Sequence, residues 1–192
     1  MALKYDPDKH SRHSIRLSGY NYAQPNAYFV TMCSNQRECL FGEITDREMR
    51  LNEYGQIVHD AWLRSEEIRR EIELDAFVVM PNHIHGIVII HDVGADCIRP
   101  LSRAHGRAPL PPAQHQRKPH SLGSFIAGFK SATTRRINAI RDTPGLPVWQ
   151  RNYYEHIIRN EDELHCIRQY IADNPMRCEM DQENPYRQGN DR

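Results

Sequence analysis

The sequence has no long apolar stretch. None of its runs approaches the roughly 20 consecutive apolar residues that a bilayer-spanning helix needs. Residues 1–10 are polar and lack the apolar centre of a signal peptide. These absences argue against a membrane protein, and we expect a cytoplasmic one.

Cysteine pairs are also missing. The five cysteines are odd in number, scattered, and never spaced as C-x-x-C; they are Cys33, Cys39, Cys97, Cys166 and Cys178. This pattern indicates neither a disulfide framework nor a zinc ribbon. We interpret them as reduced thiols that serve mainly in packing.

Net charge is zero, but the charge is unevenly distributed. Residues 42–98 hold five basic and twelve acidic side chains, whereas residues 99–141 hold nine basic and no acidic ones. Such a basic block is usually a solvated face, and it would also serve as a surface for phosphates. Nucleic acid therefore stays open as a partner despite the neutral total.

The order of expected elements indicates an α+β fold. The pattern predicts strands from 27, over 77–80, over 83–90 and over 148–158, and helices after Asn52, over 121–141 and over 160–173. This order is that of a ferredoxin-like antiparallel sheet with helices on one face.

Segments without periodicity divide the chain. We expect an N-terminal arm over 1–26, a catalytic domain over 27–175 and a tail over 176–192. Within the domain, residues 92–120 are rich in Pro, Arg and His and have no apolar period, so they are interpreted as a basic insertion or loop.

A His-Ile-His triplet follows the predicted hairpin turn and begins the 83–90 strand. Alternate residues of a strand share a face, so His83 and His85 project together while Ile84 points away. Two imidazoles so placed can hold one metal ion. The same triplet is equally typical of two surface or hydrogen-bonded histidines.

The last predicted helix carries a second candidate pair. Tyr170 and Asn174 are four residues apart and share a helix face, so they can offer a phenol and an amide oxygen to one site. A phenol, with a pKa near 10, needs a nearby cation to act as a nucleophile. With two imidazoles and an amide, Mg²⁺ or Mn²⁺ is expected, and nitrogen ligands favour Mn²⁺. Taken alone, Tyr170 is also typical of a core tyrosine, and Asn174 of a helix end.

Three linked motifs carry a resemblance to a known family. They read MPNHIHGIV at 80–88, VWQRNYYEHIIRN at 148–160 and YIADNP at 170–175, preceded by SIRL at 14–17 and YFVT at 28–31. Together they resemble the REP-associated tyrosine transposases, which belong to the single-tyrosine HUH transposases of bacteria.

The resemblance implies a function for each motif. His83 and His85 would be metal ligands, Asn174 the third ligand, and Tyr170 a nucleophile that forms a 5′-phosphotyrosine link. The implied substrate is single-stranded or hairpin DNA from repetitive extragenic palindromes, handled in the bacterial cytoplasm beside the nucleoid by a monomer or homodimer.

Further residues are candidates for supporting roles. His156 is a possible neighbour of the metal ligands or a structural histidine. Possible DNA contacts are Arg16, Arg99, Arg103, Arg107, Arg117, Lys118, Lys130, Arg135, Arg136, Arg151, Tyr153 and Tyr154. As adjacent strand residues, Tyr153 and Tyr154 should point to opposite faces, which disfavours them as the nucleophile.

Two other functions compete with the transposase. The first is a domesticated protein that binds hairpin DNA through the basic block without cutting it. The second is a zinc hydrolase that activates water, although no third acidic or histidine ligand stands at a diagnostic spacing.

Overall fold

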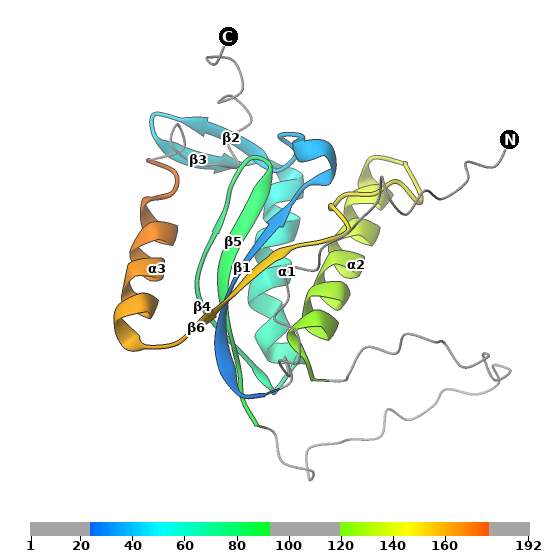
Figure 1. The fold of residues 1–192 in the computed structure, drawn as a ribbon. Helices are drawn as coiled ribbons and strands as arrows, with labels where there is room; N and C mark the ends of the chain where they lie inside the picture. Colours follow the sequence, from blue (N-terminus) through cyan, green and yellow to red (C-terminus); the bar gives the residue numbers. More distant parts are fainter. Residues whose placement is uncertain (1–23, 93–119, 177–192) are drawn as a thin grey trace, which may run out of the picture.

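A computed structural model describes residues 24–92 and 120–176 (Figure 1). Its centre is a four-stranded antiparallel sheet in the order β4-β5-β1-β6. The strands are β1 (Asn26–Cys33), β4 (Ile72–Val79), β5 (His83–Ile90) and β6 (Tyr154–Ile158). The α+β class and the ferredoxin-like strand order expected from the sequence are confirmed.

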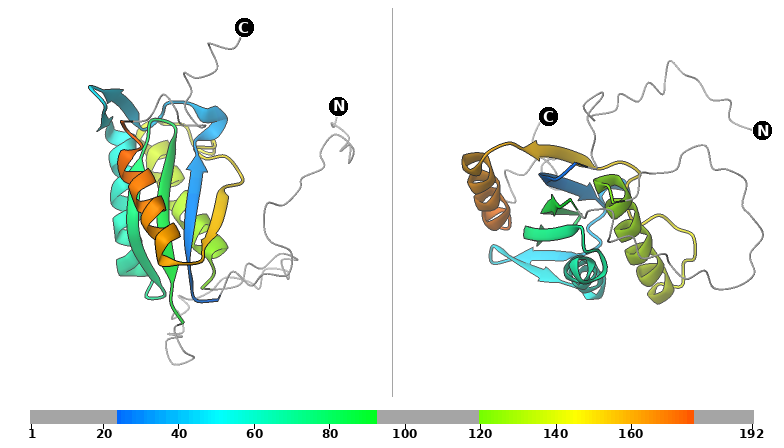
Figure 2. Two further views of the ribbon diagram at one scale, coloured as in Figure 1. Left: turned by 60° about the vertical axis from the view of Figure 1, so that its left-hand side comes forward. Right: turned by 90° about the horizontal axis from the view of Figure 1, so that it is seen from below.

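The helices lie on both faces of the sheet. Helices α1 (Glu53–Ile68) and α2 (Leu122–Ile140) cover one face, and α3 (Glu161–Asp173) lies against the other (Figure 2). The expectation of helices on one face is thus correct for α1 and α2 and wrong for α3. Its apolar stripe packs on the side chains that alternate with those under α1 and α2, which places α3 opposite them.

The α1/α2 face holds the larger apolar core. Trp62 of α1 is fully buried among the rings of Phe77, Phe125 and Phe129. Gly86 of β5 makes this packing possible, because a Cβ at that position would lie 2.5 Å from the Trp62 ring. Close approach of the indole to the strand therefore requires glycine.

Side-chain caps start the three helices where the sequence predicts. Asn52, Ser121 and Asn160 accept hydrogen bonds from backbone N–H groups three residues later. At the start of α3, Glu163 also accepts a hydrogen bond from the backbone N–H of Arg159.

Two elements differ from the sequence prediction. Only Tyr154–Ile158 of the expected 148–158 strand pairs with β1, while Trp149 makes one isolated bridge to Ser34. A hairpin of β2 (Gly42–Thr45) and β3 (Glu48–Leu51) was not predicted from the sequence. Each strand has only four residues, and the alternation of Glu48-Met49-Arg50-Leu51 is too short to stand out as a strand signal.

Several expectations fall on residues outside the described ranges. These are the N-terminal arm up to residue 23, most of the basic insertion and the tail beyond 176, together with Arg16, Arg99, Arg103, Arg107, Arg117 and Lys118. Among the helices within 24–92 and 120–176, none combines the length and apolarity needed to cross a bilayer.

Candidate active site

His83 and His85 meet at the start of β5, on the α3 face of the sheet. Both are buried, at 1% and 3% exposure. Their Nε2 atoms lie 3.0 Å apart and the two rings are inclined by 69°. Strand alternation brings the side chains together as predicted, with Ile84 buried in the opposite core.

The other nitrogen of each imidazole is held by an oxygen. His83 Nδ1 lies 2.7 Å from Asn82 Oδ1, and His85 Nδ1 lies 2.8 Å from Thr31 Oγ1. An amide oxygen only accepts, so Nδ1 of His83 donates and its Nε2 carries a lone pair. This is the arrangement by which oxygen acceptors orient histidines that bind metals.

Two ring nitrogens 3.0 Å apart need either a hydrogen atom or a cation between them, because two lone pairs would repel each other. With a lone pair on His83 Nε2, either a proton on His85 or a cation must lie in the gap. With a proton on His85 Nε2 the contact is an N–H···N hydrogen bond, and a divalent cation held by both nitrogens would take the place of that proton.

Tyr170 of α3 reaches this histidine pair. Its Oη lies 3.3 Å from His85 Nε2, and its ring meets that of His85 edge-on. The ring of Phe29 stacks on His85 and contacts Tyr170 from the side. Tyr170 is 40% exposed, so its side chain contacts His85 and also remains accessible from solvent. The alternative of a buried core tyrosine is therefore wrong.

Asn174 follows one turn later and is 2% exposed. Its Oδ1 is buried and has no hydrogen-bond partner among the described residues. Leaving a buried amide oxygen unsatisfied costs about 1–3 kcal/mol. An oxygen of this kind suits Mg²⁺ or Mn²⁺, so the residues present fit the divalent cation expected from the sequence.

The described residues contain no group of three His, Cys, Asp or Glu side chains that could hold a metal. A zinc site normally draws its protein ligands from those residue types. Two imidazoles and one amide oxygen are the ligands available here. This composition weighs against the zinc hydrolase.

His156 lies on the same face but contacts a different group. Its Nε2 is 2.6 Å from Glu163 Oε1 in the first turn of α3. The N–H of Arg159 and then His156 lower the pKa of the Glu163 carboxyl. The contact shown for His156 therefore fastens the start of α3 and does not orient a metal ligand.

Tyr153 and Tyr154 point to opposite faces, as the sequence predicts. Tyr154 lies on the α3 face, half exposed, with its ring edge-on to Phe29. Tyr153 lies on the α2 side, where the Lys130 ammonium sits 5.6 Å from its ring centre. Only Tyr154 shares a face with the histidines.

A cavity of about 1190 Å³ lies between α2 and the segment that leads to β6. It brings together four of the candidate DNA contacts, namely Lys130, Arg135, Arg151 and Tyr153. Asp142 and Glu155 also line it, so its charge is mixed. Arg136 is not among its lining residues and instead lies near Asp60 of α1, whose pKa is lowered by Gln56 first and more weakly by Arg136.

Lys130 is the most enclosed of these cations. Its Nζ donates to the carbonyls of Gln150 and Asn152, both at 2.9 Å. Burial lowers the pKa of Lys130 to about 8. Within the described part of the chain, no ion pair or hydrogen bond holds Arg135 or Arg151, so both guanidinium groups are available to a ligand.

Sequence reasoning missed Phe29, Thr31 and Asn82. Asn82 adjoins His83, so its polar side chain beside the triplet was an available signal. Phe29 and Thr31 alternate on β1, but only the β1–β5 register places Thr31 opposite His85. Their contacts depend on tertiary pairing.

Comparisons with known proteins agree with this architecture. The solved structure of a REP-associated tyrosine transposase bound to a REP hairpin matches with a TM-score of 0.55 and 20% identity, over 85% of this chain and 74% of that one. The protein therefore has the fold of a REP-associated tyrosine transposase. A putative transposase of Deinococcus radiodurans gives a TM-score of 0.44 at 19% identity, over 83% of this chain and 97% of that one.

A protein of Haemophilus influenzae, described as uncharacterized, is 40% identical over 186 residues. These cover 95% of this chain and 98% of that protein. The chain belongs to the same family as this protein. No protein-family model matches the sequence.

Proposed function

We propose that this protein cleaves and rejoins single-stranded DNA with Tyr170 as the nucleophile and a divalent cation as cofactor. The observation that carries the proposal is the 3.3 Å contact of Tyr170 Oη with His85 Nε2, beside His83. A phenol that is open to solvent and adjoins two converging imidazoles differs from a core tyrosine. The shared fold with a tyrosine transposase supports the same assignment.

The reaction needs no external energy source. Tyr170 Oη attacks the phosphorus of a phosphodiester, the new P–O bond forms to the 5′ side, and the bond to the 3′ oxygen breaks. The departing strand takes up a proton as a free 3′-OH, and the proton of the phenol is released. Attack by a 3′-OH on the phosphotyrosine reverses these changes and joins two strands.

His83, His85 and Asn174 would hold the cation, with Mn²⁺ suited to the two nitrogen ligands. When bound, the ion would supply positive charge that favours phenolate formation and neutralises the phosphodiester. The protein's own part is orientation: Asn82 and Thr31 fix the imidazoles, and Phe29 limits the motion of the Tyr170 ring.

DNA would contact two regions. Tyr154 offers an exposed ring on the face of the histidines, where a base could stack. The cavity beside α2 offers Arg135 and Arg151 to phosphates. The similar transposase was solved with a REP hairpin, and we propose hairpin DNA with a single-stranded flank as the substrate here.

The decisive experiment incubates the full chain with labelled hairpin DNA and Mn²⁺ and looks for a denaturation-resistant protein–DNA adduct. Wild type should form the adduct and Tyr170→Phe should not, while its thermal unfolding stays unchanged. Tyr154→Phe is the matched control, because it removes a hydroxyl from the same face and should still form the adduct. An adduct in Tyr170→Phe would refute the assignment.

A hairpin-binding protein without cleavage activity is the second candidate. The observation in its favour is that the cavity lined by Lys130, Arg135 and Arg151 lies on the α2 side of the sheet, away from Tyr170. Salt-sensitive binding of the hairpin by wild type, with no adduct in Mg²⁺ or Mn²⁺, would favour this function.

A further inference from the structure

Helix α3 rests on a small apolar base. Leu164 and Ile171 are its buried residues, and they pack with Ile87 and Ile158 of the sheet. The partly buried residues packed against this cluster are Ala27, Phe29, Ala76, Val78, Ile89 and Ile167. Apolar packing is not directional, so a few aliphatic contacts restrain the rotation of a helix about its own axis only weakly. The reaction proposed above needs that rotation to be fixed, because Tyr170 contacts His85 from this helix and Asn174, the proposed third ligand, follows one turn later.

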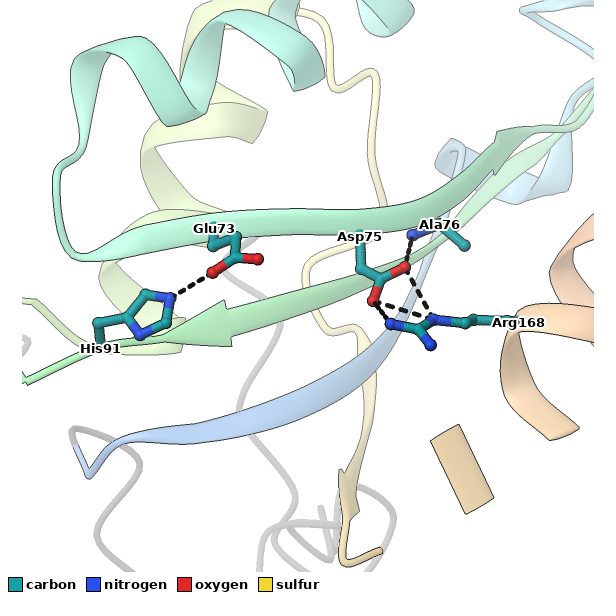
Figure 3. Close-up of polar contacts among 5 residues, drawn as sticks. All are labelled: Glu73, Asp75, Ala76, His91 and Arg168. Carbon is teal, nitrogen blue, oxygen red and sulfur yellow. Dashed lines mark hydrogen bonds and ion pairs between the residues drawn. The ribbon is translucent and has the colours of Figure 1, made fainter. Parts of the chain in front are cut away.

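A directional contact lies on the β4 side of α3. Arg168 donates from Nε to both oxygens of Asp75, each at 3.1 Å, and from Nη2 to Oδ2 at 2.5 Å (Figure 3). Two nitrogens on two oxygens make a planar fork that defines an orientation as well as a distance. The Asp75 side chain is 18% exposed and that of Arg168 is 45% exposed, so the carboxylate is the more shielded of the two.

An irregularity in β4 places the Asp75 carboxylate next to α3. Pairing between β4 and β5 shifts between Leu74 and Phe77, and Asp75 lies in that irregularity. Bulges of this kind redirect side chains out of the regular alternation. The N–H of Ala76 donates to Asp75 Oδ1 at 2.6 Å and so holds the carboxylate in place. The Arg168 hydrogen bonds, together with this N–H, lower the pKa of Asp75.

Arg168 and Tyr170 flank the buried stripe of α3. With 3.6 residues per turn, residues 164, 167, 171 and 174 share one side of the helix, and 168 and 170 fall to either side of it. Rotation of α3 that pulled Tyr170 away from His85 would therefore also strain the Arg168 fork.

We propose that Arg168 and Asp75 form a positioning pair that sets the rotation of α3 and thereby places Tyr170 and Asn174 against His83 and His85. Arg168 is a positioning residue that acts through Tyr170 and Asn174 and does not itself touch the histidines. This proposal rests on the proposed function, because positioning matters only if those side chains act together.

The ion pair of Glu73 with His91, also drawn in Figure 3, offers a matched control. Glu73 lies two residues before Asp75 on β4 and pairs with His91 at 2.6 Å. That pair joins β4 to the end of β5 and does not involve α3. Removing Glu73 therefore removes an ion pair from the same strand without releasing the helix.

The test compares Arg168→Ala, Asp75→Ala, Arg168→Lys, the exchange Asp75→Arg with Arg168→Asp, and Glu73→Ala. We expect Arg168→Ala and Asp75→Ala to lower the rate of adduct formation at saturating DNA at least tenfold, with hairpin affinity unchanged. Mn²⁺ affinity, measured by calorimetry, should fall several-fold because Asn174 moves as well. Lysine cannot make the two-nitrogen contact with Asp75, so the rate and Mn²⁺ affinity of Arg168→Lys should be close to those of Arg168→Ala.

The exchange should recover a large part of the lost rate and Mn²⁺ affinity, and Glu73→Ala should change neither. Wild-type rate and Mn²⁺ affinity in Arg168→Ala would overturn the proposal, as would equal losses in Glu73→Ala.

A further measurement separates this proposal from the proposed function. The imidazole ¹⁵N shifts of His85 report its contact with Tyr170 in the absence of DNA and metal. They should move in Arg168→Ala and return in the exchange variant. If wild type forms no adduct, the proposed function fails, whereas unchanged His85 shifts in Arg168→Ala overturn the positioning role alone.

Discussion

The two faces of one sheet differ in what they bury. The α1/α2 face is an apolar interior closed by Trp62 and the phenylalanines around it. The α3 face has a small apolar cluster and also buries His83, His85 and Asn174. Because neighbouring residues of a strand point to opposite sides, β5 can contribute to both. The strand thus contributes to the apolar core on one side and to the candidate site on the other.

The largest expected effect is on the apolar face. Trp62→Ala should lower the free energy of unfolding by about 3–5 kcal/mol, because it leaves a large cavity among aromatic rings. Leu164→Ala on the α3 face should fall near the lower end of about 2–5 kcal/mol, since its cluster is small. Urea denaturation measures both. A larger loss for Leu164→Ala would reverse the assignment of stability to the α1/α2 face.

A pair of threonine substitutions tests the polar groups of each face. Thr31→Val removes the oxygen that holds His85 Nδ1 and should lower Mn²⁺ affinity about 10–100-fold. Thr133→Val removes the acceptor of the Trp149 indole N–H, at 2.9 Å, on the other face. It should cost about 1–3 kcal/mol of stability and leave Mn²⁺ affinity unchanged. Calorimetry with MnCl₂ measures the Mn²⁺ affinity of both variants. An equal loss of affinity in Thr31→Val and Thr133→Val would contradict the assignment of metal binding to the α3 face.

The cavity beside α2 predicts a smaller effect, on DNA affinity. Joint replacement of Arg135 and Arg151 by alanine should weaken hairpin binding and reduce the salt dependence of log K by about 0.7 per arginine. Arg136→Ala removes a neighbouring charge that faces α1 and serves as the control. Fluorescence anisotropy at several salt concentrations measures the slopes. A larger change in the Arg136 variant would place the DNA elsewhere on α2.

The smallest expected effect is a pH dependence due to Lys130. Burial holds its pKa at about 8 in the free protein, and a DNA phosphate in the cavity would raise that pKa. A group with a higher pKa in the complex binds a proton on association, so affinity should fall several-fold as pH rises from 8 to 9.5. Lys130→Met should show a flat profile, provided that its thermal unfolding matches wild type. An equal pH dependence in that variant would assign the effect to another group.

Much of the fold could be predicted from local signals. The caps Asn52 and Asn160 and the alternating strands gave the element order, and this order gave the strand arrangement. The side on which α3 packs could not be predicted, because its apolar stripe fits either face of a sheet. The β2–β3 hairpin was missed because strands of four residues are too short for an apolar period to stand out.

The candidate site shows the same division. Spacing alone placed His83 with His85 and Tyr170 with Asn174, because strand and helix periods are local properties of the chain. Spacing could not predict that Tyr170 contacts His85, because 85 positions separate these two residues in the chain. It also could not identify Thr31, Phe29 or Asp75 as their neighbours.

The sequence by itself determined which residues share a face within each element. Only the tertiary structure decided which faces meet, because sheet register, the irregularity at Asp75 and the packing of α3 depend on contacts distant in the chain. The histidine pair was specified locally. Its partner Tyr170, the buried oxygen of Asn174 and the fork between Arg168 and Asp75 came together only when α3 packed on the sheet.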